Sequence, residues 1–528
     1  MWPTVNNQLS FPESELNIPK TGICLSGGGT RAMVCGVGQL KGLYDLGIID
    51  SVGYLSCVSG GSWASVPFTY YRSGAKNDEE LLGTTMAPSD LTLTNLNKLE
   101  PGFLATAAHA SFLDTAIHEI KNTNWDRLWL DAVGKCYMQP FGIYSNDKLY
   151  YYSYDDATVK DIIARNPNLK KDDFITVHSA PGDAHRPYLI VNSSITGPYF
   201  DAPFNNPEPL AVFNYTPLYV GSAQALAADY TSEKTNTVHS HNIGGGFIEP
   251  FAFGGLSPAE LPAPCGGPNK GLCVQLDIGT DTFSIADASG TSSSAFVADL
   301  TSFGIDGVSL KSLAPRVNYW PVSADSLTPS LDFMFGDGGN LENFGLISLL
   351  QRDVDRIVVF VNTSTAINTK FNFNKEPTAK DIDADILPLF GYGYSKTSDM
   401  NNNQVFSQTD FDTLMHQFID CKNNGTTVMA KTKYVTTEND WWGIPAKDSV
   451  DILWVYNEEV KEWRDSLEWE IKVELDLGIL GDFPYFPHYA LVGEDGALVR
   501  LSPREINLLY QLSAWNVKTN PEAFEFLK

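Results

Sequence analysis

Two glycine-rich turns near the N-terminus carry residues that could do chemistry. The stretch Ser26-Gly27-Gly28-Gly29-Thr30-Arg31 follows a short apolar run, and Ser59 lies between Val58 and Gly60 after a second apolar run. Bare backbone N–H groups at a helix N-terminus stabilise negative charge, either on a phosphate or on the oxyanion of acyl transfer. A serine on a sharp strand-to-helix turn projects its hydroxyl as a nucleophile. The two turns therefore predict an anion cradle and a nucleophile.

Each turn also has a purely structural explanation. The glycine run lacks the Gly-Lys-Ser/Thr ending of a phosphate-binding Walker loop and the glycine spacing of a dinucleotide site, so it could be a tight turn and nothing more. Ser59 could simply cap a helix. The usual Gly-x-Ser-x-Gly pattern is also broken at one place, because Cys57 replaces the leading glycine.

A serine nucleophile needs a base, and Asp337 is the best candidate. It lies in Phe335-Gly336-Asp337-Gly338-Gly339, directly after an apolar run, where glycines on both sides would let the carboxylate approach another loop. An ordinary Asp-Gly turn is the alternative explanation, and Asp306 forms a competing turn of the same kind. Because the C-terminal ends of parallel strands share one side of a sheet, cradle, nucleophile and base can meet there.

The elements that must position these residues follow an α/β pattern. A strand over 21–25 precedes a helix over 30–46, and a strand over 54–58 precedes a helix over 60–71, which indicates a parallel sheet. Further expected elements are strands over 187–196, 331–335 and 356–364 and helices over 341–351, 458–475 and 503–515. Long Pro/Gly/Ser/Asn-rich stretches at 197–210, 240–268 and 366–407 predict caps or lids on one core.

Composition excludes several classes of function. Among 528 residues, 36 Lys and Arg stand against 63 Asp and Glu, so the net charge of −27 disfavours nucleic acid and anionic lipid as electrostatic partners. No leader and no apolar run of membrane-spanning length is present, which predicts a cytoplasmic protein. Seven cysteines, an odd number, do not indicate a disulfide framework, although Cys265 and Cys273 could form one bridge. No Cys/His set has zinc-like spacing, so neither metal nor cofactor is expected.

Several blocks of the chain resemble one known family. They are 26–33, 36–43 and 54–63 around the two turns, the aromatic-Thr-Pro segment 213–221, and 337–346 with the strand that follows it to 364. This text is similar to the cytosolic phospholipase A(2) and fungal phospholipase B (lysophospholipase) family of the patatin-like superfamily. The blocks span residues 21–364 in the family's order.

The resemblance implies a fold and a mechanism. The fold is α/β, a three-layer α/β/α core with a central, mostly parallel sheet and large cap insertions. The mechanism is a Ser–Asp dyad without a catalytic histidine, in which Ser59 is the nucleophile and Asp337 takes its proton. Gly28 and Gly29 would form the oxyanion hole, and Arg31 would bind the substrate phosphate, the alternative for Arg31 being a salt bridge on a helix surface.

The function implied is hydrolysis of carboxylic esters in glycerophospholipids or lysophospholipids through an acyl-enzyme, with peripheral contact to a membrane or micelle. We expect a short N-terminal extension over 1–20, a catalytic core with cap insertions over 21–365, and a C-terminal part over 366–528 packed on the same core. The first motif begins by residue 26, so no calcium-binding lipid-docking domain is expected before it. The sequence predicts no oligomeric state.

Three alternatives stay open. His416 and His488 follow Asp337, so a Ser–His–Asp esterase or lipase is available from the chain order. Acyl transfer to a lipid alcohol would use the same residues as hydrolysis, and a non-catalytic lipid-binding relative could keep the fold. Aromatic-rich stretches at 387–394, 441–445 and 483–489 could contact a membrane, but packing in the core or cap is the favoured explanation for them.

Overall fold

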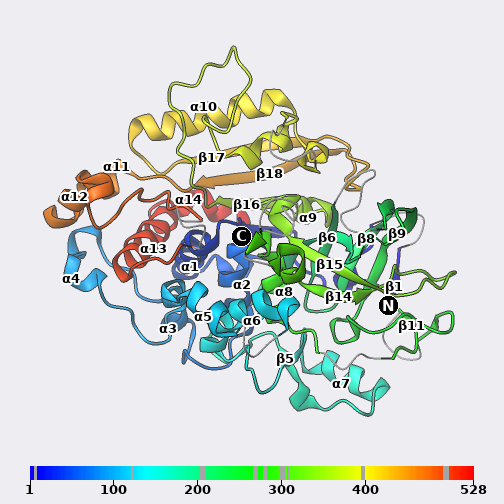
Figure 1. The fold of residues 1–528 in the computed structure, drawn as a ribbon. Helices are drawn as coiled ribbons and strands as arrows, with labels where there is room; N and C mark the ends of the chain where they lie inside the picture. The colour runs from blue at the N-terminus through cyan, green and yellow to red at the C-terminus, as the bar shows by residue number, and fades with distance from the viewer. Residues whose placement is uncertain are drawn as a thin grey trace.

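The computed structural model describes residues 1–4, 9–119, 124–200, 210–232, 234–265, 271–277, 282–295, 304–305, 308–393, 399–491 and 499–528. A sheet of 12 strands runs through the molecule (Figure 1). Its strands are β1 (Trp2–Pro3), β2 (Thr21–Leu25), β3 (Tyr54–Val58), β6 (Tyr188–Pro198), β7 (Ala211–Tyr215), β8 (Val220–Thr231), β9 (Val238–Ile248), β14 (Arg316–Tyr319), β15 (Leu331–Asp337), β16 (Arg356–Val361), β17 (Met429–Thr436) and β18 (Lys447–Tyr456).

The centre of this sheet is parallel. Its path is β1-β9-β8-β7-β6-β3-β2-β16-β18-β17, and the neighbours from β6 to β18 pair in parallel. The strands flanking this centre pair antiparallel, as do β14 and β15, which join the sheet through β6. The expected α/β class with a parallel central sheet is confirmed.

Helices cover both faces of the parallel strands, which makes three layers. Ile23 and Leu25 of β2 pack in one hydrophobic core with α1 (Gly29–Asp45), α2 (Gly60–Tyr70) and α13 (Pro503–Lys518). Cys24 points to the opposite face, into a second core with α9 (Leu346–Gln351) and α10 (Gln408–Asn424). Because both faces are buried, β2 and β3 are continuous apolar runs instead of alternating ones. Figure 1 shows α10 and the β17–β18 pair at the top, above α1, α2 and α13.

The C-terminal helix α13 packs closely on α1. A Cβ atom on Gly38 would lie 2.6 Å from the carbonyl oxygen of Tyr510, and one on Gly42 would lie 2.5 Å from the Cβ of Val517. Glycine usually weakens a helix interior, but here it lets two helix backbones approach each other. The residues after 366 also supply β17 and β18 to the same sheet. The last third of the chain therefore helps to hold the helix that carries the glycine turn.

Two expectations about elements are wrong. The amphipathic helix expected over 458–475 is divided into α11 (Lys461–Asp465) and α12 (Trp469–Asp476), because the chain turns so that Leu467 enters a core beside α13. Part of the loop expected over 240–268 is the strand β9, where Gly244 has φ 76° next to an irregularity in the β8–β9 register. Glycines in a bulged strand look like loop residues in a sequence.

The remaining helices are mostly short. They are α3 (Asp78–Leu82), α4 (Leu93–Leu96), α5 (Phe112–Glu119), α6 (Leu128–Val133), α7 (Asp156–Arg165), α8 (Ile285–Ser292) and α14 (Pro521–Phe524). Within the described ranges, no helix is both long and apolar enough to span a bilayer. Cys265 and Cys273, which the sequence left as a candidate pair, form a disulfide.

Candidate active site

Ser59 occupies a strained turn between β3 and α2. Its backbone has φ 51° and ψ −126°, a positive φ that is uncommon for a residue with a side chain and that typifies nucleophile elbows. The residues after it must be glycines: a Cβ on Gly60 would lie 2.1 Å from the carbonyl oxygen of Gly29, and one on Gly61 2.3 Å from that of Leu25. The elbow is thus pressed against the glycine turn, and Ser59 keeps 9% of its surface exposed.

The strand β6 brings Asp337 to Ser59. Val58, the last residue of β3, pairs with Asn192 of β6, and Asp337, the last residue of β15, pairs with the next residue, Ser193. Because β7 occupies the other edge of β6, β3 and β15 share one edge and run toward each other along it. The expectation that the base would follow a parallel strand is wrong, since β15 is antiparallel to β6. The two strand ends meet head to head instead.

The Asp337 carboxyl is held in a nearly dry environment. The residue is 3% exposed, and the Gly339 N–H donates to its Oδ1 at 2.7 Å. Burial raises the pKa of Asp337 to about 7, against the opposing effects of the Gly339 N–H and of a hydrogen bond from the Ser59 hydroxyl. A carboxyl whose pKa lies near neutrality can both accept and return a proton at physiological pH.

The glycine turn places its N–H groups beside the elbow. Gly28 has φ 131° and Gly29 has φ 58°, so both adopt backbone conformations that favour glycine, and Gly29 begins the 17-residue helix α1. The Gly27 N–H is used in a hydrogen bond to the carbonyl oxygen of Asn343. The N–H groups of Gly28 and Gly29 have no acceptor among the residues that the structure describes. They are available to an anion at the positive end of a helix.

Arg31 is buried below this turn. Its Nε donates to the carbonyl oxygen of Asn362 at 3.0 Å and its Nη1 to that of Tyr489, while a Cβ on Gly28 would lie 2.4 Å from its Nη2. No carboxylate in the described part of the chain lies within ion-pair distance, and burial lowers the pKa of the guanidinium. The alternative of a surface salt bridge is therefore wrong. The charge of Arg31 instead faces the glycine turn.

Residues that the sequence did not point to hold the elbow in place. The Ser59 N–H donates to Ser292 Oγ of α8 at 3.0 Å, and the Ser292 hydroxyl donates to the carbonyl oxygen of Asn192. The Asn343 side chain lies between the glycine turn and the turn after Asp337, because its Oδ1 would be 2.2 Å from a Cβ on Gly27 and 2.7 Å from a Cβ on Gly339. The only available signal was the polar ending of an otherwise apolar strand at Asn192.

Neither candidate histidine takes part. His416 stacks on Phe373 with ring centroids 3.9 Å apart, and His488 faces the carbonyl oxygen of Thr363 and the Glu458 carboxylate. Among the described residues, no histidine contacts Ser59 or Asp337, so the geometry does not support a Ser–His–Asp triad. The competing Asp306 lies outside the described residues.

The neighbouring thiol is not a second nucleophile. Cys57 is fully buried, and burial raises its pKa to about 12. A thiol attacks as the thiolate, which is scarce at such a pKa. The cysteine that breaks the usual elbow pattern therefore behaves as a small apolar residue.

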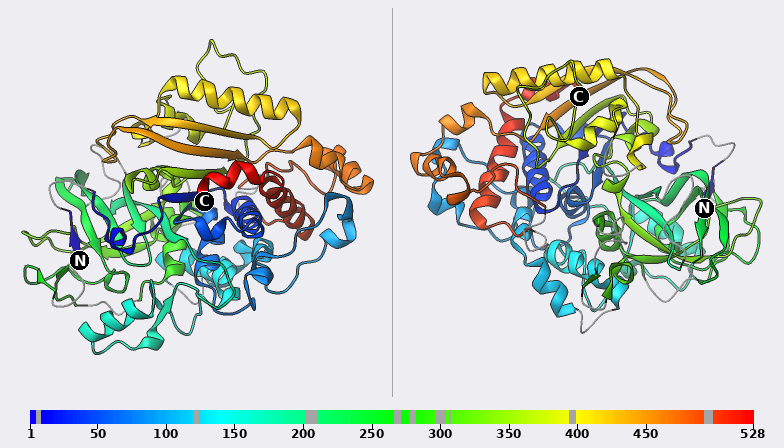
Figure 2. Two further views of the ribbon diagram at one scale, coloured as in Figure 1. Left: turned by 180° about the vertical axis from the view of Figure 1, so that it is seen from behind. Right: turned by 45° about the horizontal axis from the view of Figure 1, so that its top comes forward.

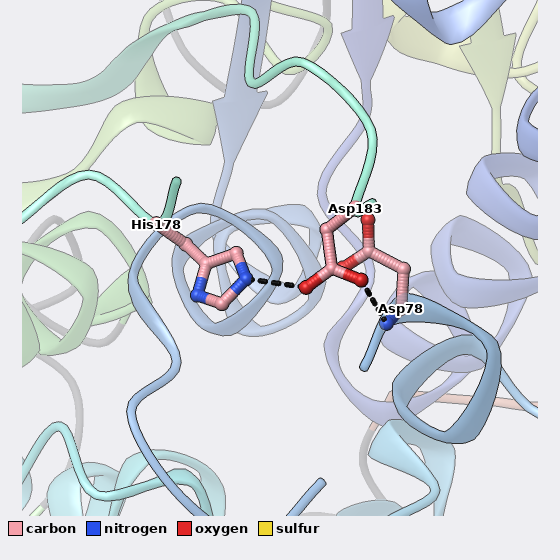
Figure 3. A group of neighbouring side chains, drawn as sticks. All are labelled: Asp78, His178 and Asp183. Atoms are coloured by element: carbon pink, nitrogen blue, oxygen red, sulfur yellow. Dashed lines mark hydrogen bonds and ion pairs between the residues drawn. The ribbon is translucent and has the colours of Figure 1, made fainter. Parts of the chain in front are cut away.

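A second polar cluster has a structural role. Asp78, His178 and Asp183 lie together, as Figure 3 shows, and His178 Nε2 is 2.7 Å from an Asp183 oxygen. The Asp78 carboxylate is already occupied by the Arg186 guanidinium, which binds it through two nitrogens in a buried pair. The cluster is thus held by an ion pair and hydrogen bonds among its own residues and Arg186.

Comparisons with known proteins single out the segment that carries both turns. Residues 21–76 match the model of the lysophospholipase catalytic domain. Human cytosolic phospholipase A2 beta is 37% identical over 98 residues, 19% of this chain and 12% of that protein. Mouse cytosolic phospholipase A2 zeta is 46% identical over 66 residues, 12% of this chain and 8% of that protein. The match therefore spans only a small part of the curated relatives.

A comparison of whole structures gives a distant neighbour. The structure of human GIVD cytosolic phospholipase A2 is 14% identical with a TM-score of 0.47, covering 97% of this chain and 63% of that chain. The resemblance of the sequence to this family is confirmed over the segment that carries the glycine turn and Ser59.

Proposed function

The chain shares the lysophospholipase catalytic-domain signature with the cytosolic phospholipases A2, and on this premise we propose that it hydrolyses the carboxylic esters of glycerophospholipids or lysophospholipids. The observation that carries the proposal is the meeting of Ser59 and Asp337 at the facing ends of β3 and β15. The turn at Gly28 and Gly29 beside them supports acyl transfer over a purely binding role, because it offers N–H donors where an oxyanion would form.

The reaction proceeds in two steps. Asp337 accepts the Ser59 proton as Ser59 Oγ attacks the ester carbonyl, and the N–H groups of Gly28 and Gly29 stabilise the oxyanion. The intermediate collapses to an acyl-Ser59 ester. Asp337 gives its proton to the leaving alcohol oxygen, which belongs to the lysolipid or to the glycerol phosphate. Asp337 then takes a proton from the water that attacks the acyl ester, and it returns this proton to Ser59 Oγ as the fatty acid is released.

Arg31 selects a phosphate-bearing substrate. Its guanidinium has carbonyl partners but no carboxylate among the described residues, so a phosphodiester would supply the missing counter-ion. Such substrates lie in membranes or micelles, which makes a peripheral lipid surface the partner of this enzyme. We place this activity in the cytoplasm, consistent with the cytosolic phospholipases that the chain resembles.

One assay tests the proposal. The purified chain is incubated with a mixture of phospholipids, lysophospholipids and triacylglycerol, and the products are identified by mass spectrometry. Ser59→Ala must abolish fatty acid release, whereas Ser513→Ala, which removes another buried hydroxyl, must leave it intact. Free fatty acid is the expected product, and acyl groups moved onto added lipid alcohols would instead reveal a transferase. A wild-type protein that forms no product contradicts the proposal.

A further inference from the structure

The helix α12 and the turn after it expose apolar side chains on one side. Trp469, Val473 and Leu477 follow one another at intervals of four residues, and they are 65%, 44% and 48% exposed. Ile479 and Leu480 extend them with 67% and 83% exposure. Residues four apart share a helix face. We call these five residues the apolar patch.

The opposite side of α12 is firmly anchored. Ile471 is fully buried in a core with Leu467, Trp463 and residues of α13 and α4. Both views in Figure 2 place the orange α11 and α12 at the outer edge of the molecule, beside the red α13. The apolar patch is therefore an outward face of a fixed helix, since the inner face has its own apolar partners.

The chain leads directly from the apolar patch to the candidate active site. Tyr485 is 68% exposed, and after it Phe486 stacks on Trp463 and meets the ring of Tyr489, with centroids 6.0 and 6.1 Å apart. The carbonyl oxygen of Tyr489 accepts a hydrogen bond from Arg31. The patch and the proposed phosphate-binding arginine are thus joined through one packed segment.

The aromatic stretches that the sequence suggested for membrane contact are for the most part packed inside. Trp442 is 2% exposed, Phe390 is fully buried, and Phe483 and Tyr489 are 1% and 3% exposed. These stretches have high hydrophobicity because they fill the cores around α10 and α13. For these residues the favoured explanation, packing in the core, is confirmed, and a run of exposed apolar residues lies on 469–480 instead.

The charge of the surrounding segment and the small size of the apolar patch indicate which kind of partner covers it. Between 461 and 482 three basic residues stand against seven acidic ones, and Lys461, Arg464 and Lys472 all donate to groups of the chain itself. An anionic lipid surface would be repelled. A stable protein interface takes about 20–30 residues on each side, more than the patch and Tyr485 provide. A few apolar side chains led by a tryptophan suit the interfacial zone of a bilayer.

We propose that the apolar patch docks the protein on a zwitterionic phospholipid surface and presents the arginine side of the active site to it. This inference rests on the proposed phospholipid substrate. Insertion of Trp469 and Leu480 removes their side chains from water, and Tyr485 reaches the head-group level beside them. Tyr489 would then hold Arg31 on the side of the molecule nearest to the lipid phosphates.

Vesicle binding by the full chain tests the proposal. The Ser59→Ala protein is mixed with phosphatidylcholine vesicles, so that binding is measured without consuming the lipid. Adding Trp469→Ser and Leu480→Ser must weaken binding by about tenfold or more, equivalent to about 1.4 kcal/mol. The matched control replaces Val238 and Leu261, which are 64% and 55% exposed elsewhere on the surface, with serine and must bind unchanged.

A second arm separates the docking surface from the catalytic proposal. Proteins with Ser59 intact are assayed on a water-soluble short-chain ester, where the patch variant must match the wild type. Unchanged vesicle binding by a patch variant that still cleaves the soluble ester overturns the docking surface and leaves the proposed function standing. If the patch substitutions abolish vesicle binding but the wild-type protein cleaves no ester, the docking surface is supported and the proposed function is overturned.

Two further outcomes would refute the choice of partner. If the wild type is a dimer in solution that the patch variant dissolves, while vesicle binding stays the same, the patch is a protein interface. If phosphatidylglycerol vesicles bind more tightly than phosphatidylcholine vesicles and salt weakens that binding, the surface selects anionic lipid. Tighter binding to phosphatidylcholine, insensitive to salt, is the expected result.

Discussion

Replacing Asp337 by asparagine should stabilise the protein while inactivating it. The carboxyl is 3% exposed, and burial raises its pKa from 3.8 to about 7. Keeping such a group ionised in the folded state costs about 4 kcal/mol at pH 8 relative to the unfolded chain. The asparagine oxygen can still accept the Gly339 N–H, now without a buried charge. Asp337→Asn should therefore be more stable than the wild type at pH 8 by up to about 4 kcal/mol.

The sign of the pH dependence follows from the raised pKa. The folded protein binds the Asp337 proton more tightly than the unfolded chain, so wild-type stability falls as pH rises from about 4 to about 7 and then levels off. Denaturant unfolding of both proteins at pH 4, 6 and 8 measures the difference, with Asp172→Asn as an exposed control. An advantage of Asp337→Asn that does not grow with pH, or a loss of stability at pH 8, would show that burial does not raise the pKa of the Asp337 carboxyl.

The same ionisation controls catalysis. Asp337 can accept the Ser59 proton only as a carboxylate, so kcat/KM on a soluble ester should rise with pH and reach a plateau above about 7, falling tenfold per pH unit on the acid side. Asp337→Asn should lower kcat by about 10²–10⁴-fold. A flat pH profile in the wild type would show that another group takes the proton.

Three other substitutions probe the surroundings of the site. Gly60→Ala would set a Cβ atom 2.1 Å from the backbone of the glycine turn, so kcat should fall by about 10²–10³-fold, while Gly393→Ala, with open space around it, should be silent in the same assay. Arg31→Lys keeps a charge but loses the second carbonyl contact, so KM should rise for a lysophospholipid and stay unchanged for an uncharged ester, as steady-state kinetics would show. Ser292→Ala removes the acceptor of the Ser59 N–H and should lower the free energy of unfolding by about 1–3 kcal/mol in denaturant titrations. No loss of stability would mean that the elbow needs no support from α8.

The sequence predicted the parts of the site that depend on neighbouring residues. The strand ending at Leu25, the turn at Gly28 and Gly29 and the elbow at Ser59 each combine an apolar run with glycines within about ten residues, and the structure has all of them in the expected places. Such local signals are readable because strand burial and glycine turns leave distinct compositions.

The position of Asp337 beside Ser59 could not be predicted in the same way. Its position depends on which residue of β6 faces the end of β15, and register between strands more than a hundred residues apart leaves no local signal. The sequence therefore identified Asp337 by its glycine neighbours and by resemblance, but gave the wrong direction for its strand. Ser292 was missed for the same reason, since only tertiary packing brings α8 to the elbow.

The helix expected over 458–475 failed for a different reason. The segment has apolar residues on more than one side of its second half: Ile471 is buried, whereas Trp469 and Val473 are exposed. Periodicity shows that a segment has apolar faces, but not whether each face has a partner within the molecule. Trp469 and Val473, which have no such partner among the described residues, belong to the apolar patch.

In the proposed mechanism Ser59 is the nucleophile and Asp337 activates it. A fluorophosphonate carrying an acyl-like chain tests this directly, because it bonds covalently to an activated serine hydroxyl. Mass spectrometry of the labelled chain should locate one adduct on the peptide containing Ser59, with a labelling rate that rises up to about pH 7 and drops sharply in Asp337→Asn. Labelling at another serine, or unchanged labelling of Ser59 in Asp337→Asn, would contradict a Ser59–Asp337 dyad.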